Sequence, residues 1–168
     1  MNRARAVLFS SVLVTCIGCD HATKIAATAL LPRQGISLAA DLLHFQLVYN
    51  HGAFLGMGAN LPPAARIVIL GGLVPLGLFA VSVWLLRGAA VSRLQLAAIG
   101  LIVGGGLGNW IDRLVHDGRV TDFLSVGVGG LRTGIFNFAD VAVVGGMLLL
   151  LVATRAAERD GDIPSVDS

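Results

Sequence analysis

Charged and amide side chains occur in short groups within strongly apolar stretches of the chain. Asp20 and Lys24 are four residues apart, so a helix would place them on one face, where they can pair. Asn137 and Asp140 are three residues apart at the start of another apolar stretch. A charge inside a bilayer costs at least about 2.5 to 3.5 kcal/mol, so such side chains are candidates for a functional role.

A third group of polar side chains lies at the C-terminal end of another apolar stretch. Asn109, Asp112 and Arg113 have the i, i+3, i+4 spacing of one helix face. Structural explanations compete at all three groups: an ion pair at 20 and 24, an interfacial pair at 112 and 113, and a helix cap at 137 and 140.

Aspartate is the ionisable residue type that the three groups share. Two carboxylates a few Å apart cannot both ionise, so they share one proton. One can then act as a base that activates water and the other as an acid, which hydrolyses a peptide bond without a covalent intermediate. The sequence has no serine elbow, no His-Glu-x-x-His motif and no grouping of metal ligands, and its four histidines are scattered. These residues indicate an aspartic peptidase without a metal.

The composition requires a membrane. The chain is 55% hydrophobic and 13% charged, whereas a soluble domain carries about 25% charged residues. A membrane helix needs about 20 predominantly apolar residues. Residues 1–154 are therefore expected to form one membrane domain, followed by a polar, disordered tail at 155–168. Four stretches qualify as spans: about 6–30, 66–86, 92–111 and 137–154.

Arginines flank the short connections, which places both termini and the turn after Arg87 on the cytoplasmic side. The two long connections, 31–65 and 112–136, then lie outside. All three polar groups fall near this outer level, whereas an ion channel or pump would usually need polar groups through the full thickness. The net charge of +2 is too small to indicate binding to nucleic acid.

Five short motifs resemble those of lipoprotein signal peptidase, also called signal peptidase II. The resemblance covers most of the chain and rests on motifs of five or six residues in a fixed order. They are D-H-A-T-K at 20–24, N-H-G-A-F at 50–54, G-N-W-I-D-R at 108–113, G-R-V-T-D-F at 118–123 and F-N-F-A-D at 136–140.

The resemblance implies a multi-pass enzyme of the bacterial plasma (inner) membrane that uses no cofactor. Such an enzyme removes the signal peptide from diacylglyceryl-modified prolipoproteins, just before the lipidated cysteine, and is inhibited by compounds of the globomycin type. Carried over by motif, the catalytic dyad is Asp122 and Asp140. The supporting residues are Asp20, Lys24, Asn50, Gly52, Asn109, Asp112, Arg113 and Asn137.

The family fold that the resemblance implies is an all-α membrane protein with four transmembrane helices. A small outer-face β-cradle and a short amphipathic helix would come from residues 31–65. Asp112 and Asp122 are one residue further apart than expected of the family, so Asp117 competes for the first dyad position. Asp122 is preferred, because V-T-D-F matches the family context and Asp117 lies in H-D-G, a turn signal. Asp122 is expected in a loop.

Three other classes of protein remain as alternatives. A small transporter subunit predicts polar groups along the full spans and internal repeats, and the sequence has neither. A non-catalytic factor that binds lipid-anchored proteins would use the same cleft, although both candidate aspartates are present. An intramembrane protease of another class would act on ordinary helices, and dependence on substrate lipid separates it from the first interpretation.

Overall fold

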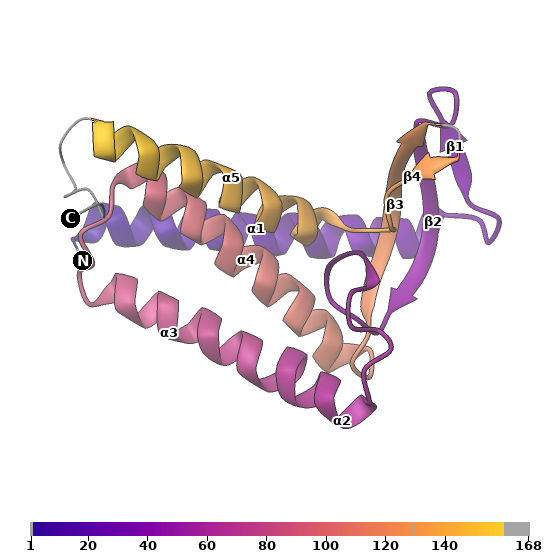
Figure 1. Ribbon diagram of the computed structural model, residues 1–168, viewed down its shortest axis with the longest axis horizontal. Helices are drawn as coiled ribbons and strands as arrows, with labels where there is room; N and C mark the ends of the chain where they lie inside the picture. Colours follow the sequence, from indigo (N-terminus) through magenta and orange to yellow (C-terminus); the bar gives the residue numbers. More distant parts are fainter. Residues whose placement is uncertain (1, 129, 160–168) are drawn as a thin grey trace.

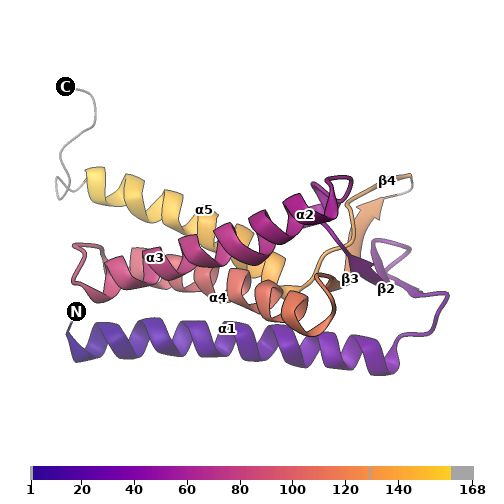
Figure 2. The same cartoon turned by 90° about the horizontal axis from the view of Figure 1, so that it is seen from below.

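In the part of the chain that the structure describes, four long helices run side by side and carry a small β-sheet at one end (Figure 1). The computed structural model describes residues 2–128 and 130–159. By length and hydropathy four helices could cross a membrane: Arg3–Leu30, Pro63–Leu86, Arg93–Val115 and Phe138–Arg159. The short turn that precedes Arg93, the start of the first helix and the end of the last helix lie at the end opposite the sheet (Figures 1 and 2).

The first span is α1 (Arg3–Leu30), and the second consists of three consecutive segments. They are α2 (Pro63–Arg66), a π-helical segment η2 (Ile67–Leu73) and α3 (Val74–Leu86). Pro75 has no backbone N–H, so it cannot make the α-helical hydrogen bond to the carbonyl of Gly71. Trp110 Nε1 donates to that carbonyl at 3.1 Å. The indole therefore ties the second span to the third.

The third span, α4 (Arg93–Val115), packs against α1, α3 and the fourth span, α5 (Phe138–Arg159). Gly100, Gly104 and Gly108, spaced four residues apart, face α1. A Cβ atom at Gly104 would lie 2.8 Å from Cys16 Cβ, and one at Gly108 would lie 2.7 Å from an Asp20 carboxylate oxygen. Glycine thus permits a separation between the two helices that any larger residue would prevent.

The sheet is antiparallel, with strand order β1-β2-β3-β4. The first two strands, β1 (Ile36–Leu38) and β2 (Leu43–Asn50), come from the first long connection, where strands were expected. The other two, β3 (Val120–Val128) and β4 (Leu131–Arg132), come from the second, which was wrongly expected to be a glycine-rich loop. β3 pairs with a strand some 70 residues earlier in the chain, for example Val48 with Asp122. Pairing at this separation leaves no local signal in the sequence.

Two helix boundaries also differ from the sequence prediction. α4 continues to Val115, so Asp112 and Arg113 lie in its last turns. α5 continues to Arg159, so residues 155–159, predicted to be disordered, are helical. The remainder of the predicted tail, 160–168, lies outside the described residues. Between β2 and α2 the structure has a 3₁₀ turn, η1 (Phe54–Gly56).

Candidate active site

Asp122 and Asp140 come together at the junction of the sheet and the helices. Asp122 lies on β3, not in a loop as expected, and Asp140 lies in the first turn of α5. Both carboxylates are buried, with exposed fractions of 1% and 6%. Asn137 connects them, because its Nδ2 donates to Asp122 Oδ1 at 2.6 Å and its backbone N donates to Asp140 Oδ2 at 3.2 Å.

The remaining two carboxylate oxygens each accept from another asparagine. Asn50 Nδ2 donates to Asp122 Oδ2 at 2.9 Å, and Asn109 Nδ2 donates to Asp140 Oδ1 at 3.0 Å. Every oxygen of the two carboxylates therefore has an amide donor. Such donors hold a buried carboxylate in one orientation and stabilise its charged form.

The cap that the sequence predicted at the start of α5 is present. Asp140 N donates to Asn137 Oδ1 at 3.0 Å, while Asn137 N donates back to the Asp140 carboxylate. This reciprocal pair satisfies two backbone donors at the helix start. The same hydrogen bonds that cap α5 also fix the direction of the Asp140 side chain. The cap therefore helps to place Asp140 beside Asp122.

Burial raises the pKa of the Asp122 carboxyl to about 7. The hydrogen bond from Asn50 lowers it, the negative charge of Asp140 raises it, and the hydrogen bond from Asn137 lowers it again. Loss of hydration prevails because it penalises the charged form. Below about pH 7, therefore, Asp122 holds a proton, and the pair of aspartates retains an acid.

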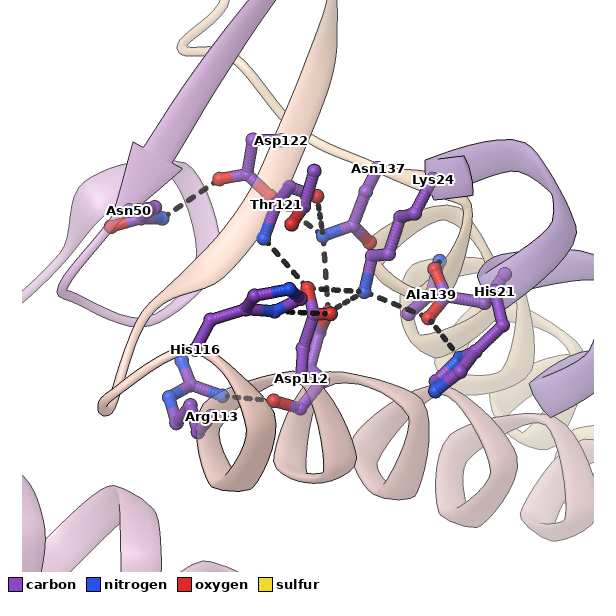
Figure 3. A network of polar contacts seen from close by, with 12 residues as sticks. His21, Lys24, Asn50, Asp112, Arg113, His116, Thr121, Asp122, Asn137 and Ala139 are labelled. Carbon is purple, nitrogen blue, oxygen red and sulfur yellow. Dashed lines mark hydrogen bonds and ion pairs between the residues drawn. The ribbon is translucent and has the colours of Figure 1, made fainter. Parts of the chain in front are cut away.

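A second buried cluster, behind the dyad, adjoins the two aspartates, and Figure 3 shows its Lys24 and Asp112 near Thr121 and Asn137. Lys24 Nζ is 2.8 Å from Asp20 Oδ2 and 3.2 Å from Asp112 Oδ2, and all three side chains are buried. The pairing predicted from the spacing of Asp20 and Lys24 is therefore confirmed. Lys24 also donates to Asn109 Oδ1 at 2.9 Å, which connects the cluster to Asp140.

The two acids of this cluster each hold the backbone just before one aspartate of the pair. Asp20 Oδ1 accepts from Ala139 N at 3.0 Å, and Ala139 immediately precedes Asp140. Asp112 Oδ2 accepts from Thr121 N at 2.7 Å, and Thr121 immediately precedes Asp122. Lys24 bridges the two acids. Its ammonium group therefore helps to fix β3, through Asp112, and α5, through Asp20, relative to each other.

Arg113 has a different partner from the one expected. The sequence suggested an interfacial pair with Asp112, but the Arg113 guanidinium donates to the Gly52 carbonyl at 2.6 Å and to the Asn109 carbonyl at 3.0 Å. Gly52 N in turn donates to Asn50 Oδ1 at 2.7 Å. A Cβ at Gly52 would lie 2.6 Å from the carbonyl oxygen of Met57, so only glycine fits there. Arg113 thus fixes the loop that carries Asn50.

The ten residues that the motifs predicted lie in one connected network, whereas Asp117 lies apart from it. Asp117 occupies the turn between α4 and β3 with a positive φ of 52°, as H-D-G predicted. Its side chain is 93% exposed and lies 3.5 Å from Arg119. The sequence did not reveal the backbone donors of Thr121 and Ala139, because every residue except proline carries the same N–H. It also did not reveal His116, whose Nδ1 lies 3.1 Å from Asp112 Oδ1.

Two grooves of different character open at the pair of aspartates. The first, of about 360 Å³, is mainly apolar and includes Asp140. The second, of about 400 Å³, is lined by strand and loop residues and includes Asp122. Leu55, in η1, borders both. The apolar groove is lined by Phe54, Leu55, Thr133, Phe136, Asp140, Val141, Val144, Gly145 and Leu148.

A family model described as signal peptidase (SPase) II matches residues 12–155. The lipoprotein signal peptidase of Beijerinckia indica is 43% identical over 159 residues, which cover 91% of this chain and 90% of that protein. The lipoprotein signal peptidase of Methylobacterium sp. (strain 4-46) is 36% identical over 145 residues, covering 85% and 86%.

Solved structures agree with the fold. A bacterial membrane enzyme superposes with a TM-score of 0.76 at 25% identity, over 95% of this chain and 94% of that one. A second bacterial membrane enzyme superposes with a TM-score of 0.74 at 23% identity, over 87% and 91% of the two chains. Both similarities extend over most of the molecule.

Proposed function

The chain belongs to the signal peptidase II family, and on this premise we propose that Asp122 and Asp140 are its catalytic dyad. It is a membrane aspartic peptidase that removes signal peptides from prolipoproteins. One observation supports the assignment of the dyad above all. The buried carboxylates of Asp122, on β3, and Asp140, on α5, are held by one set of amide donors, in which Asn137 donates to both.

The dyad hydrolyses the peptide bond through two proton transfers. Asp140, ionised, takes a proton from a water molecule, whose oxygen attacks the scissile carbonyl carbon. Asp122, protonated, donates its proton to the carbonyl oxygen, which gives a neutral tetrahedral intermediate. The proton taken by Asp140 then passes to the leaving nitrogen as the carbon–nitrogen bond breaks, and Asp122 recovers its proton from the intermediate's hydroxyl.

The two grooves fit a substrate that is half lipid and half peptide. The apolar groove along α5 suits the acyl chains of a diacylglyceryl-modified cysteine, since its lining offers almost only apolar contacts. The second groove offers Asn50, His51 and Arg66 to peptide backbone. The scissile bond just before the cysteine then lies between them, at the dyad. A signal helix that enters laterally from the membrane must unwind there, because a helical backbone does not expose its carbonyls to attack.

We place the enzyme in the bacterial inner membrane, with both termini cytoplasmic and the sheet as a cradle at the outer face. Arg3, Arg5, Arg87 and Arg93 lie at the end opposite the sheet, which supports this orientation. In this arrangement η1, with exposed Phe54 and Leu55, serves as the short amphipathic element beside the dyad. Inhibitors of the globomycin type would occupy the same cleft.

The test is a gel-shift cleavage assay with purified protein in detergent. A prolipoprotein is offered with and without its diacylglyceryl group. Cleavage of the lipidated form alone supports the proposal. Cleavage of both forms would indicate a protease that acts on ordinary helices, and binding without cleavage would indicate the non-catalytic factor.

A further inference from the structure

His116 contacts Asp112, a member of the cluster behind the dyad. His116 itself has no part in the proposed reaction. It is the C-terminal capping residue that follows α4, and its Nδ1 lies 3.1 Å from Asp112 Oδ1 (Figure 3). Although the ring is partly exposed, Nδ1 is buried, and no aligned hydrogen-bond acceptor faces it among the described residues. We propose that His116 is a positioning residue that fixes the Asp112 carboxylate and, through it, both aspartates of the dyad.

The two oxygens of Asp112 have different surroundings. Oδ2 accepts from Thr121 N at 2.7 Å and lies 3.2 Å from Lys24 Nζ. Oδ1 is the oxygen that His116 contacts. Asp112 is 5% exposed, so an oxygen left without a polar neighbour there would lose its hydration without compensation. The imidazole therefore keeps the carboxylate from rotating away from Thr121 and Lys24.

A displaced Asp112 would affect both halves of the dyad. Thr121 immediately precedes Asp122 on β3, so the hydrogen bond from its backbone N sets the position of that aspartate. Lys24, the other partner of Asp112, donates to Asn109 Oδ1, and Asn109 donates to Asp140. A shift of the Asp112 carboxylate would therefore move Asp122 through the backbone of Thr121. It would move Asp140 through the side chains of Lys24 and Asn109.

The imidazole is also held on its outer side. The ring of Tyr49, on β2, lies 6.3 Å from the His116 ring between centroids. Arg119 Nε donates to the His116 carbonyl at 3.0 Å, and the Arg119 guanidinium lies 5.4 Å from the Tyr49 ring centroid.

On the side of α1, His21 and Lys24 line a pocket of about 470 Å³ with His116. His21 Nδ1 is 3.6 Å from Asp20 Oδ2, farther than the 3.1 Å that separates His116 Nδ1 from Asp112 Oδ1.

The proposal requires a nitrogen donor at the position of Nδ1. Asparagine places its side-chain nitrogen close to where histidine has Nδ1, whereas glutamine places it close to Nε2. Leucine fills similar space without a donor. His116→Asn should therefore retain the contact with Asp112, while His116→Gln and His116→Leu should lose it.

The test compares the three variants in steady-state cleavage of a lipidated prolipoprotein by the full-length protein. This inference rests on the proposed dyad, so Asp122→Asn is measured in the same assay. We expect His116→Leu to lower kcat roughly 10- to 100-fold, as loss of a supporting contact does, with KM within about twofold of wild type. His116→Asn should restore kcat to within about threefold. His44→Leu, on the outer sheet, is the matched control and should leave kcat unchanged.

Equal kcat values for His116→Leu and wild type would overturn the inference while leaving the dyad assignment intact. A rise in KM with unchanged kcat would also overturn it, because that pattern indicates a contact with substrate. If His116→Leu fails to fold, the asparagine and glutamine variants decide. Higher kcat for asparagine supports the inference, and equal values overturn it. Activity that survives Asp122→Asn would instead contradict the proposed function.

Discussion

At the scale of single residues, the proton on Asp122 is the feature that allows two buried aspartates to act as acid and base. Burial raises the pKa of this carboxyl to about 7 despite hydrogen bonds from two asparagines that oppose the shift. A carboxyl with an ordinary pKa would be ionised at neutral pH, and the dyad would then carry two charges and no acid.

The activity should depend on pH in the direction that this shift sets. Because the folded pKa of Asp122 is raised, the proton is present below about pH 7 and is lost as the pH rises through that value. We expect kcat/KM to fall about tenfold per pH unit on the alkaline side, measured between about pH 5 and pH 9. Asn50→Ala removes a hydrogen bond that lowers this pKa, so its alkaline limb should lie at higher pH. A wild-type profile that is flat up to pH 9 would contradict the account.

Asn137 should be a sensitive position, since its side chain contacts both aspartates of the dyad: Oδ1 accepts from Asp140 N at 3.0 Å, and Nδ2 contacts the Asp122 carboxylate. Its Nδ2 donates to Asp122 at 2.6 Å. A neutral hydrogen bond contributes about 0.5 to 1.5 kcal/mol, and the alanine variant loses two of them, so Asn137→Ala should lower kcat by roughly 10- to 100-fold. Gln34→Ala changes an exposed amide that does not belong to the network of site residues, and it should have no effect. Equal rates in the two variants would show that Asn137 does not orient the dyad.

Much of the site could be predicted at this scale, because the motifs carry side chains of recognisable chemistry. The pair of Asp20 and Lys24 follows directly from helical spacing. The true partner of Arg113 could not be predicted, since the Gly52 carbonyl reaches it from a loop about 60 residues away. Contacts to backbone atoms are invisible in a sequence, because they depend on the path of the chain and not on residue type.

At the scale of elements, close packing of α4 against its neighbours brings the polar clusters together. Gly105 faces α5, and a Cβ there would meet the carbonyl oxygen of Ala139, the residue before Asp140. Gly108 similarly gives the Asp20 carboxylate its room. The glycines of α4 therefore determine how far the helices that carry the site lie from one another.

Gly105→Ala should impair both stability and activity. The added methyl group overpacks the contact with α5, which typically costs about 1 to 3 kcal/mol, so the melting temperature in detergent should fall by several degrees. Because α5 must shift at Ala139, kcat should fall as well. Gly18→Ala is the control, since a Cβ at Gly18 meets nothing within 4 Å. A melting temperature for Gly105→Ala equal to that of the control would contradict this packing.

The four spans could be predicted from sequence because membrane helices need long apolar stretches, which hydropathy detects directly. The strand that carries Asp122 could not. Val120–Val128 contains Gly127, and its pairing partner lies in the first long connection. Local sequence indicates a strand poorly when distant pairing stabilises it.

At the scale of the whole molecule, the depth of the dyad follows from helix length. Asp140 is the third residue of a helix of 22 residues, which spans about 33 Å at 1.5 Å per residue. The hydrocarbon core of a bilayer is about 30 Å thick. Asp140 therefore lies close to one membrane surface, at the end that carries the sheet.

The orientation can be tested with single cysteines in a background that lacks Cys16 and Cys19. Ser37 lies on the exposed sheet, and Ala90 lies in the short turn at the opposite end. A membrane-impermeant maleimide should label Ser37→Cys in intact spheroplasts and Ala90→Cys only after lysis. The reverse pattern would place the site on the cytoplasmic side.

The most direct test of the central claim is cleavage of a lipidated prolipoprotein by Asp122→Asn, Asp140→Asn and Asp117→Asn, each shown to be folded by its melting profile. Asparagine keeps the size of each side chain and removes its acid–base chemistry. We predict that both dyad variants lose turnover by at least about 10⁴-fold, as loss of a catalytic group does, while Asp117→Asn cleaves like wild type. Turnover that survives in either dyad variant, or loss of turnover in Asp117→Asn, would contradict the assignment of Asp122 and Asp140.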